Sequence, residues 1–350
     1  MTESTTQHDQ EGPGSGTLPT SSVIIAAYNS GHCLGQTLDS IQAQSMPPGE
    51  VIVVDDGSRD ETAAIAEAHP AVTRVISTSN QGMCAARNTG IEASKGELIF
   101  ILDSDDLWHP EYMARMTRMM ADHPQASMGF SKYQAWQHPA EEPAPFEGEV
   151  DGTIKLYDLE NFTSFMHTGM PALPSFHVAR RDSLMRLGTR PYREDQIQGE
   201  AAYMFALLAT MGLVAEHVAP LGRYRMHANA VTGDEMDAAT RVEPCIDDLR
   251  TAAHGGLGLD LQLDSQQRGI IDRHAADWYR RCGRRLGGGG DRSAGRRQLL
   301  KAARIGDARA AALWLASFVP GLGFRVWVTA WRPETVRREA GTEAWSLPDP

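Results

Sequence analysis

Between residues 21 and 103 the sequence alternates short apolar runs with helical segments, and this alternation limits the chain to few folds. Each of the first three runs, which have strand length, is followed by apolar residues at helical spacing. The runs are 21–29, 50–58, 72–77 and 96–103, and the helical segments are 31–44, 60–69 and 82–94. Strands that alternate with helices in this way predict an α/β fold with a parallel sheet and right-handed crossovers.

Polar residues follow the first, second and fourth strands at the point where each strand ends. They are Tyr28 with Asn29, Asp55 with Asp56, and the segment 103–106. In open parallel sheets, ligands bind beyond the carboxyl ends of the strands. We therefore expect these residues to converge on one crevice, although they are far apart in the sequence.

The stretch FILDSDDLWHP, residues 100–110, runs a buried strand directly into Asp103, Asp105 and Asp106. Carboxylates this close disfavour one another's charged form. A solvated turn is one interpretation, and an N-cap from Asp105 or Asp106 on a helix beginning near Pro110 is a second. The third is a site for Mg²⁺ or Mn²⁺, which takes one or two carboxylates together with substrate phosphates. We favour the cation site, because a cap explains only one carboxylate.

The rest of the chain changes character near residue 241. Before it we expect a helix over 110–122, a strand over 126–136, an exposed loop over 138–152 and a helix over 199–212, with only a short strand before residue 221. After it the pattern becomes mostly helical, with a glycine-rich hinge at 284–292.

Charge divides the chain at the same place. Residues 1–240 carry 15 basic and 32 acidic side chains, whereas residues 241–350 carry 18 and 13. The acidic part does not suit nucleic acid, which favours a basic face. The basic part predicts either a solvated, arginine-rich helical face or contact with an anionic membrane surface or an acidic partner.

Cysteine spacing and hydropathy indicate a cytoplasmic protein. The four cysteines are far apart and lack metal-site spacing, which is typical of free thiols in a reducing compartment. Residues 1–20 lack the apolar core of a signal peptide and are expected to form a disordered leader. No apolar run reaches the length of a membrane-spanning helix.

Four segments of the chain, taken in order, carry a family resemblance. They read SVIIAAYNS, VIVVDDGSRDET, NQGMCAARNTGIEASKGELIFILDSDD and YRMHANAVT. Together, and with these spacings, they resemble the signature of the bacterial family 2 glycosyltransferases of the GT-A fold, over roughly residues 20–233. The resemblance implies a Rossmann-like, mostly parallel central sheet flanked by helices, with a C-terminal helical extension.

The resemblance also implies a domain plan and an activity. Residues 21–240 would form the glycosyltransferase domain, with a nucleotide-binding half over 21–125 and an acceptor half over 126–240, and residues 241–350 a helical C-terminal region. The family transfers a sugar, with inversion, from a nucleotide diphosphate to an acceptor. We expect a UDP-sugar donor, a Mn²⁺ or Mg²⁺ cofactor, and a glycan or lipid-linked acceptor in polysaccharide or glycoconjugate synthesis.

The resemblance assigns donor and metal residues by position. Tyr28 would contact the base, Asp56 would accept a hydrogen bond from it, and Arg225 would offset charge on the leaving diphosphate. The full donor set is Ala26, Ala27, Tyr28, Asp55, Asp56, Arg87, Asp103, Ser104 and Arg225, and the metal set is Asp105, Asp103, Asp106 and His227.

Several of these roles have an alternative. Arg87 is as well placed for an ion pair with a nearby acid as for a donor contact. Asp106 would support the metal site or serve as a second ligand, and His227 would bind metal or phosphate or be structural. Trp108 would stack on a sugar or, as Trp more commonly does, pack in the core. At Ala26 and Ala27 the family usually has Pro-Thr, which leaves only backbone contacts here.

The catalytic base is the point where the chain departs from the family. An acceptor hydroxyl must lose a proton as it attacks, and a carboxylate is the usual base. The family has Glu-Asp at a helix start, where this chain has Glu200 followed by Ala201. We rank Glu200 first, Asp195 second and Glu194 third, and the alternative is that all three are surface acids at a helix start.

The acceptor region, residues 130–200, carries no pattern that identifies an acceptor. His167, Ser175 and His177 are candidates by position alone. Two other functions remain open: a sugar nucleotidyltransferase, which the lack of a glycine-rich phosphate loop after the first strand argues against, and a non-catalytic nucleotide-sugar binder, which Ala201 suggests.

Overall fold

The computed structural model describes most of the chain in two compact units. The first unit comprises Met1–Asp158, Ala172–Tyr192 and Met211–His227, and the second comprises Leu159–Pro171, Arg193–Thr210 and Ala228–Pro350. The residues described are 17–137, 146, 151–166, 173–194, 200–226, 243–259, 261–288 and 290–318. Most of the expected leader and loop, and the candidates His167, Asp195 and His227, lie outside these ranges.

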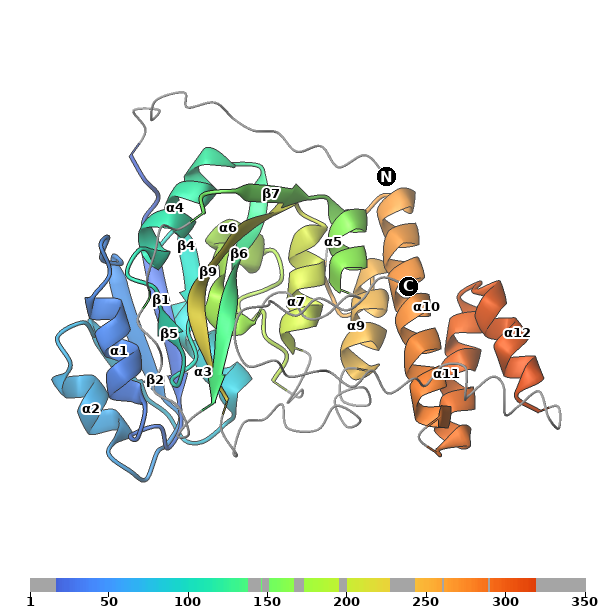
Figure 1. Ribbon diagram of the computed structural model, residues 1–350, viewed down its shortest axis with the longest axis horizontal. Coiled ribbons are helices and arrows are strands. Elements are labelled where there is room, and N and C mark those ends of the chain that lie inside the picture. The colour runs from blue at the N-terminus through green and yellow to red at the C-terminus, as the bar shows by residue number, and fades with distance from the viewer. Residues whose placement is uncertain are drawn as a thin grey trace. The chain divides into compact units, whose positions relative to one another are not determined.

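Four parallel strands form one half of the sheet in the first unit (Figure 1). In spatial order they are β3 (Arg74–Ser77), β2 (Glu50–Asp55), β1 (Ser21–Ala27) and β4 (Leu98–Ile101). The pairs β1–β2, β1–β4 and β2–β3 are all parallel. The carboxyl ends of β1, β2 and β4 therefore lie along the same edge of the sheet, as the sequence predicts.

The other half of the sheet is mixed. Strand β8 (His177–Arg180) pairs antiparallel with β4 and with β6 (Ala126–Gln137), and β6 pairs parallel with β9 (Leu213–Met226). Two short strands, β5 (Leu107–Trp108) and β7 (Ile154–Tyr157), pair antiparallel with β9. Strand β9 is longer than expected, because its pairing with β6 continues to its last residue.

Helices cover both faces of the parallel half, because strand side chains alternate between the two faces. Val23, Val53 and Phe100 belong to the apolar core that includes α1 (Leu34–Gln42) and α4 (Tyr112–Asp122). On the other face, Ile52 and Val54 pack against Ala86 of α3. The remaining helices of this unit are α2 (Thr62–Ala68), α3 (Met83–Ala93), α6 (Arg181–Met185) and the 3₁₀ turn η1 (Pro174–Phe176).

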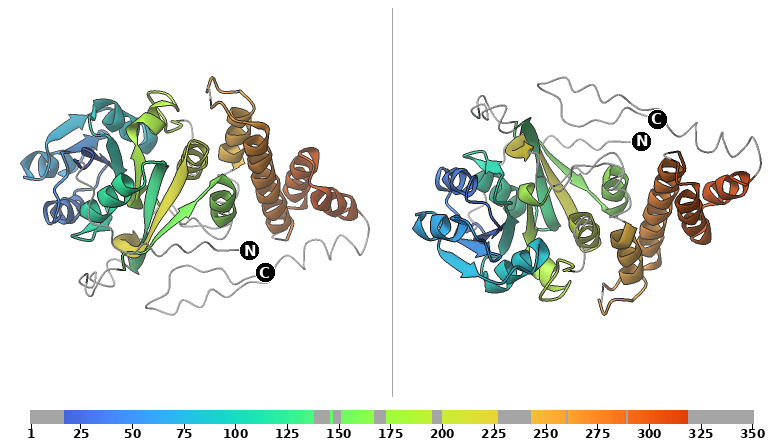
Figure 2. Two further views of the ribbon diagram at one scale, coloured as in Figure 1. Left: turned by 90° about the horizontal axis from the view of Figure 1, so that it is seen from above. Right: turned by 90° about the horizontal axis from the view of Figure 1, so that it is seen from below.

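The described part of the second unit is helical. Helices α10 and α11 pack side by side, and α12 packs on α11 (Figures 1 and 2). A Cβ on Gly295 would lie 2.6 Å from the carbonyl oxygen of Gly283, so α10 and α11 approach closely there. The helices are α5 (Leu159–Met166), α7 (Glu200–Ala209), α9 (Glu243–Ala253), α10 (Ser265–Gly288), α11 (Arg292–Arg304) and α12 (Ala308–Ala316).

The two units do not follow the expected boundary at residue 240. Helices α5 and α7 group with the helices after residue 243 instead of with an acceptor half. The reason lies in α7, where every described side chain is buried, including Met204, Phe205 and Leu208. A helix that is apolar all round must be covered on all sides.

Most of the expected elements are confirmed, and the fold class with them. The N-cap interpretation of the acidic cluster is wrong, because α4 has Glu111 at its N-cap, five residues beyond Asp106, and no side-chain capping bond. Within the part of the chain that the structure describes, no helix has the length and apolar composition to cross a membrane.

Candidate functional site

The loop after β4 brings the acidic cluster to the carboxyl edge of the sheet, where neighbouring segments hold it. The Oγ atoms of Ser104 and Ser30 lie 2.7 Å apart, and Thr37 of α1 donates from Oγ1 to the Ser104 carbonyl over 3.0 Å. The amide of Asp106 donates to the carbonyl of Asp103 over 3.3 Å and closes the turn. The loop is thus tied to the segment that follows β1.

Asp103 forms an ion pair with Arg87 of α3. The Nη2–Oδ1 distance is 2.6 Å, and the Arg87 side chain is 1% exposed against 28% for Asp103. The guanidinium also lies over the ring of Tyr192, 5.2 Å from its centroid. Of the two roles expected for Arg87, the ion pair is therefore present, and the donor contact stays a prediction.

Asp106 is buried beneath the loop. Its Oδ1 accepts a hydrogen bond of 2.9 Å from the backbone amide of Arg225 on β9. Burial, reinforced by the charges of Asp105 and Asp103, raises the pKa of Asp106 well above its usual range. The three carboxyl groups therefore coexist because Arg87 balances the charge of Asp103, burial favours the neutral form of Asp106, and Arg225 of β9 donates to the Asp105 carbonyl.

The pair after β2 shapes the neighbouring loops. Asp56 is buried, and its two carboxylate oxygens accept from the amides of Gln81 and Gly82 over 2.9 and 2.7 Å, just before α3 begins. Asp55, also buried, accepts from the amide of Ser58 over 3.1 Å. Both carboxylates therefore fix the backbone that borders the crevice, and the predicted contact of Asp56 with a base is untested.

Tyr28 lies exposed at the rim of this edge. Tyr28 is 45% exposed. The next residue, Asn29, has a left-handed backbone (φ 48°), which Asn tolerates better than most residues. Its amide donates to Ser58 Oγ and its Oδ1 accepts from the amide of Arg59, both over 2.9 Å. Ala26 is partly exposed and Ala27 is buried beside it.

Three candidates beside the loop support it from beneath. Trp108 is buried and stacked on Tyr112 at 4.2 Å, so its core role is confirmed, and its Nε1 donates to the Ser175 carbonyl over 2.7 Å. Ser175 accepts from the Asp103 amide through Oγ over 3.2 Å. His177 is buried, and its Nδ1 donates to the Pro174 carbonyl over 2.5 Å. Burial lowers the pKa of His177 to about 4, helped by the nearby Arg87 charge.

Some residues of the site have no role assigned from the sequence, although Asn88 lies beside Arg87 in the third segment that carries the family resemblance. Asn88 donates from Nδ2 to the Tyr192 carbonyl over 2.8 Å and accepts from the Tyr192 amide over 2.9 Å, which places the ring beside Arg87. Gln36 accepts a hydrogen bond from Arg225, and the Trp136 ring lies under the Arg225 guanidinium, both from distant segments. Only the alternation of strand residues hints at Trp136, which lies opposite Arg225 in the β6–β9 register.

The candidate bases are placed only in part. Glu194 is exposed in a turn, and Glu200 is the first residue of α7, followed by the buried Ala201. Both belong to the second unit. Asp195 lies outside the described residues. The ranking of the base therefore stays a prediction.

The acidic loop suits a divalent cation by chemistry. Asp103 and Asp105 are partly exposed and offer hard oxygen ligands, whereas Asp106 is buried. Among the described residues there is no group of three or more His, Cys, Asp or Glu that could hold a metal alone. A Mg²⁺ ion bound with substrate phosphates needs only one or two carboxylates, so these residues fit such an ion.

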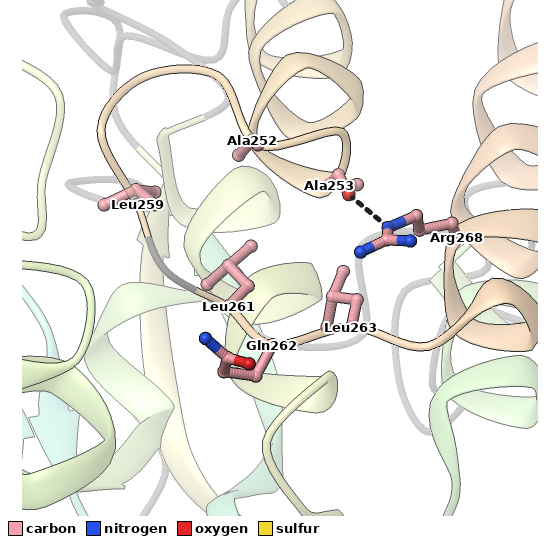
Figure 3. A pocket seen from close by; sticks show the side chains of 8 residues that line it. Ala252, Ala253, Leu259, Leu261, Gln262, Leu263 and Arg268 are labelled. Atoms are coloured by element: carbon pink, nitrogen blue, oxygen red, sulfur yellow. Dashed lines mark hydrogen bonds between the residues drawn. The ribbon is translucent and has the colours of Figure 1, made fainter.

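The second unit holds a separate cavity of about 210 Å³ (Figure 3). Leu261 and Leu263 form part of its wall, and Arg268 donates from Nε to the Ala253 carbonyl over 3.2 Å at its edge. Among the residues that the structure describes, its lining contains no carboxylate, imidazole or thiol.

The first unit is thus a helix-flanked, partly parallel sheet with an Asp-x-Asp loop beyond its carboxyl edge. Residues 22–187, just under half of the chain, match the family described as Glycosyl transferase family 2.

Two relatives with related sequences carry names from sugar transfer or polysaccharide synthesis. The chain is 31% identical to EpsH of Bacillus subtilis (strain 168), named as a glycosyltransferase, over 61% of this chain and 62% of EpsH. It is 40% identical to the succinoglycan biosynthesis protein ExoO of Rhizobium meliloti (strain 1021), over 28% of this chain and 29% of ExoO. The chain thus covers less than two thirds of the length of these relatives.

Solved structures share the GT-A fold. S. aureus TarS 1–349, in complex with UDP-GlcNAc, has 17% sequence identity and a TM-score of 0.61, covering 89% of each chain. The mannosyltransferase PcManGT from Pyrobaculum calidifontis, in complex with GDP-Man and Mn²⁺, has 19% identity and a TM-score of 0.55, covering 90% of this chain and 84% of that one. At these identities the likeness establishes the fold alone.

Proposed function

We propose that this protein is an inverting, metal-dependent glycosyltransferase that builds a polysaccharide or glycoconjugate. The observation that carries the proposal is the Asp103–Asp106 loop, held at the carboxyl edge of the sheet by Arg87 and Arg225 in a family 2 domain. The relatives named above, including a succinoglycan biosynthesis protein, support a role in polysaccharide synthesis.

The donor is a nucleotide-diphosphate sugar, and we favour UDP. Tyr28, exposed at the rim, contacts the base, and the backbone of Ala26 and Ala27 runs beside it. Asp103 addresses the ribose side with Ser104. The UDP-GlcNAc in TarS favours UDP, while the GDP-Man in PcManGT keeps GDP as the competing donor.

Mn²⁺ or Mg²⁺ is the proposed cofactor. Asp105 is the first ligand, with Asp103 and His227 as further candidates, and the bound ion neutralises charge on the diphosphate. Asp106 supports this site from beneath, because its oxygen is bonded to the Arg225 amide. The Mn²⁺ reported with PcManGT supports the choice of ion.

Inversion requires a carboxylate that takes the proton of the acceptor hydroxyl as it attacks the anomeric carbon. We keep Glu200 as the base, with Asp195 and then Glu194 as alternatives. The acceptor is a glycan or a lipid-linked sugar. Ala201, buried in α7 where the family has its aspartate, supports one competing function, a non-catalytic nucleotide-sugar binder.

Thermal shift with UDP, GDP, CDP and dTDP, each with Mn²⁺, Mg²⁺ or EDTA, tests the proposal. A ligand that binds the native state raises the melting temperature by mass action. We expect a metal-dependent rise with UDP that Asp105→Asn abolishes and Asp122→Asn, at an exposed site on α4, retains. In a second assay, slow hydrolysis of an added UDP-sugar would distinguish an enzyme from a non-catalytic binder. The absence of a melting-temperature shift with any nucleotide would refute the donor site.

We also propose that the protein works in the cytoplasm and touches the inner face of the membrane through its basic C-terminal helices. The cysteines Cys33, Cys84, Cys245 and Cys282 are buried and outside any disulfide, as in a reducing compartment. Leu315, in the last turn of α12, and Phe318, just after the helix, are 61% and 54% exposed. Exposed arginines on α11 and α12 accompany them: Arg292, Arg297, Arg304 and Arg309.

Sedimentation with vesicles tests the membrane contact. Apolar side chains beside basic ones bind anionic interfaces and lose affinity with salt. We expect the protein to sediment with phosphatidylglycerol vesicles and not with phosphatidylcholine vesicles, and Leu315→Glu to weaken sedimentation. Equal recovery with both vesicle types would contradict this contact.

A further inference from the structure

Arg225 is buried at the end of β9 and makes four contacts with residues from other segments. Its Nε donates to the carbonyl of Asp105 over 2.6 Å, and its Nη2 donates to Oε1 of Gln36 over 2.7 Å. Its guanidinium lies over the ring of Trp136, 4.8 Å from the centroid, and its amide donates to Asp106 over 2.9 Å. A buried guanidinium is stable only when its donors are satisfied in this way.

This geometry argues against the direct diphosphate contact expected of Arg225. The side chain is 1% exposed, and its Nε and Nη2 donate to a main-chain carbonyl and to a side-chain amide. The planar fork of an arginine, with donors at fixed angles, is suited to holding two such acceptors at once. Arg225 therefore binds the acidic loop itself.

The contacts of Arg225 complete the support of the loop. Asp103 is held by Arg87 and by Ser175, and Ser104 by Thr37. The peptide between Asp105 and Asp106 comes next along the loop, within the turn that the Asp106 amide closes. Arg225 grips this peptide at both residues, through the carbonyl of one and the carboxyl group of the other.

We propose that Arg225 is a positioning residue, which with Gln36 and Trp136 holds the Asp105–Asp106 peptide and so presents Asp105 to the metal and diphosphate. The presentation of Asp105 to metal and diphosphate rests on the proposed function. The hydrogen bonds that hold the loop do not depend on it, and the two parts of the proposal are measured separately.

Gln36 gives the mildest test, because it is exposed on α1 and its loss does not threaten the core. Gln36→Ala removes one acceptor of Arg225, whereas Gln36→Glu retains an acceptor at that position and serves as the rescue. Gln42→Ala, also exposed on α1, is the matched control. Arg225→Lys keeps the charge but not the fork.

Two measurements follow each variant. Hydrogen exchange of the ligand-free protein reports the mobility of residues 103–108. Titration of Mn²⁺ in the presence of UDP, read by melting temperature, reports the apparent metal affinity, and UDP alone with EDTA reports metal-free binding. Loss of a charge-assisted hydrogen bond is expected to change the exchange rate and the metal affinity by about tenfold.

We expect Arg225→Lys and Gln36→Ala to speed exchange of the loop and weaken Mn²⁺ binding, with metal-free UDP binding and the ligand-free melting temperature unchanged in Gln36→Ala. Gln36→Glu and Gln42→Ala should match the parent protein. Unchanged exchange in both weakened variants would overturn the inference. Loss of metal-free UDP binding in Arg225→Lys would also overturn the inference, because it would indicate that Arg225 contacts the phosphates directly. A parent protein that binds no nucleotide, with exchange as expected, would refute the proposed function and leave the grip on the loop supported.

Discussion

Acidification is expected to destabilise the first unit through His177. The ring is buried, and burial favours the neutral form in the folded protein, although the hydrogen bond from Nδ1 to the Pro174 carbonyl opposes this in part. The pKa of His177 is lowered to about 4 by burial and by Arg87, against an ordinary value of 6.5. Because the unfolded chain binds the proton more readily, this contribution to stability is complete above pH 6.5 and is lost as the pH falls toward 4.

The magnitude follows from these two pKa values. Between pH 8 and pH 5 the unfolded imidazole becomes almost fully protonated while the folded one stays largely neutral, which lowers the free energy of unfolding by about 2 kcal/mol. His177→Gln removes the titrating group. The difference in stability between the parent protein and this variant should therefore shrink by about 2 kcal/mol at pH 5.

Hydrogen exchange of peptides from β4 and β8 measures this difference, because it reports the opening of the first unit alone. His32→Gln, at an exposed residue, is the control and should leave the pH dependence as it is. A difference between parent and His177→Gln that is equal at pH 8 and pH 5 would show that the imidazole is not held neutral, and the reasoning would fail.

Three glycine substitutions test the packing. Gly222→Ala would place its Cβ 2.1 Å from the ring of Phe176 and should destabilise the first unit by about 1–3 kcal/mol, measured by exchange in β9. Gly35→Ala meets no atom within 4 Å and lies in α1, so it should stabilise that unit by about 0.5–1 kcal/mol. Gly295→Ala, 2.6 Å from the Gly283 carbonyl, should speed exchange in α10 and α11 while leaving β4 unchanged.

The order of strands and helices in the first hundred residues could be read from the sequence. Buried runs such as Ile24–Ile25 and Ile52–Val54 are apolar on both faces of the sheet, and local periodicity is enough to find them. The convergence of Asp55, Asp56 and the Asp103 loop at one edge follows from parallel pairing alone. The length of β9 does not, because its last residues are strand only through pairing with β6.

The sequence by itself therefore determined the sheet, its functional edge and the acids gathered there, since these depend on residues close together in the chain. Only the tertiary structure decided how the acids are held. Asp103 and Arg87 are 16 residues apart, and Arg225 and Asp105 are 120 apart. A hydrogen bond between such distant residues leaves no local pattern, because it depends on where the packed core places both groups.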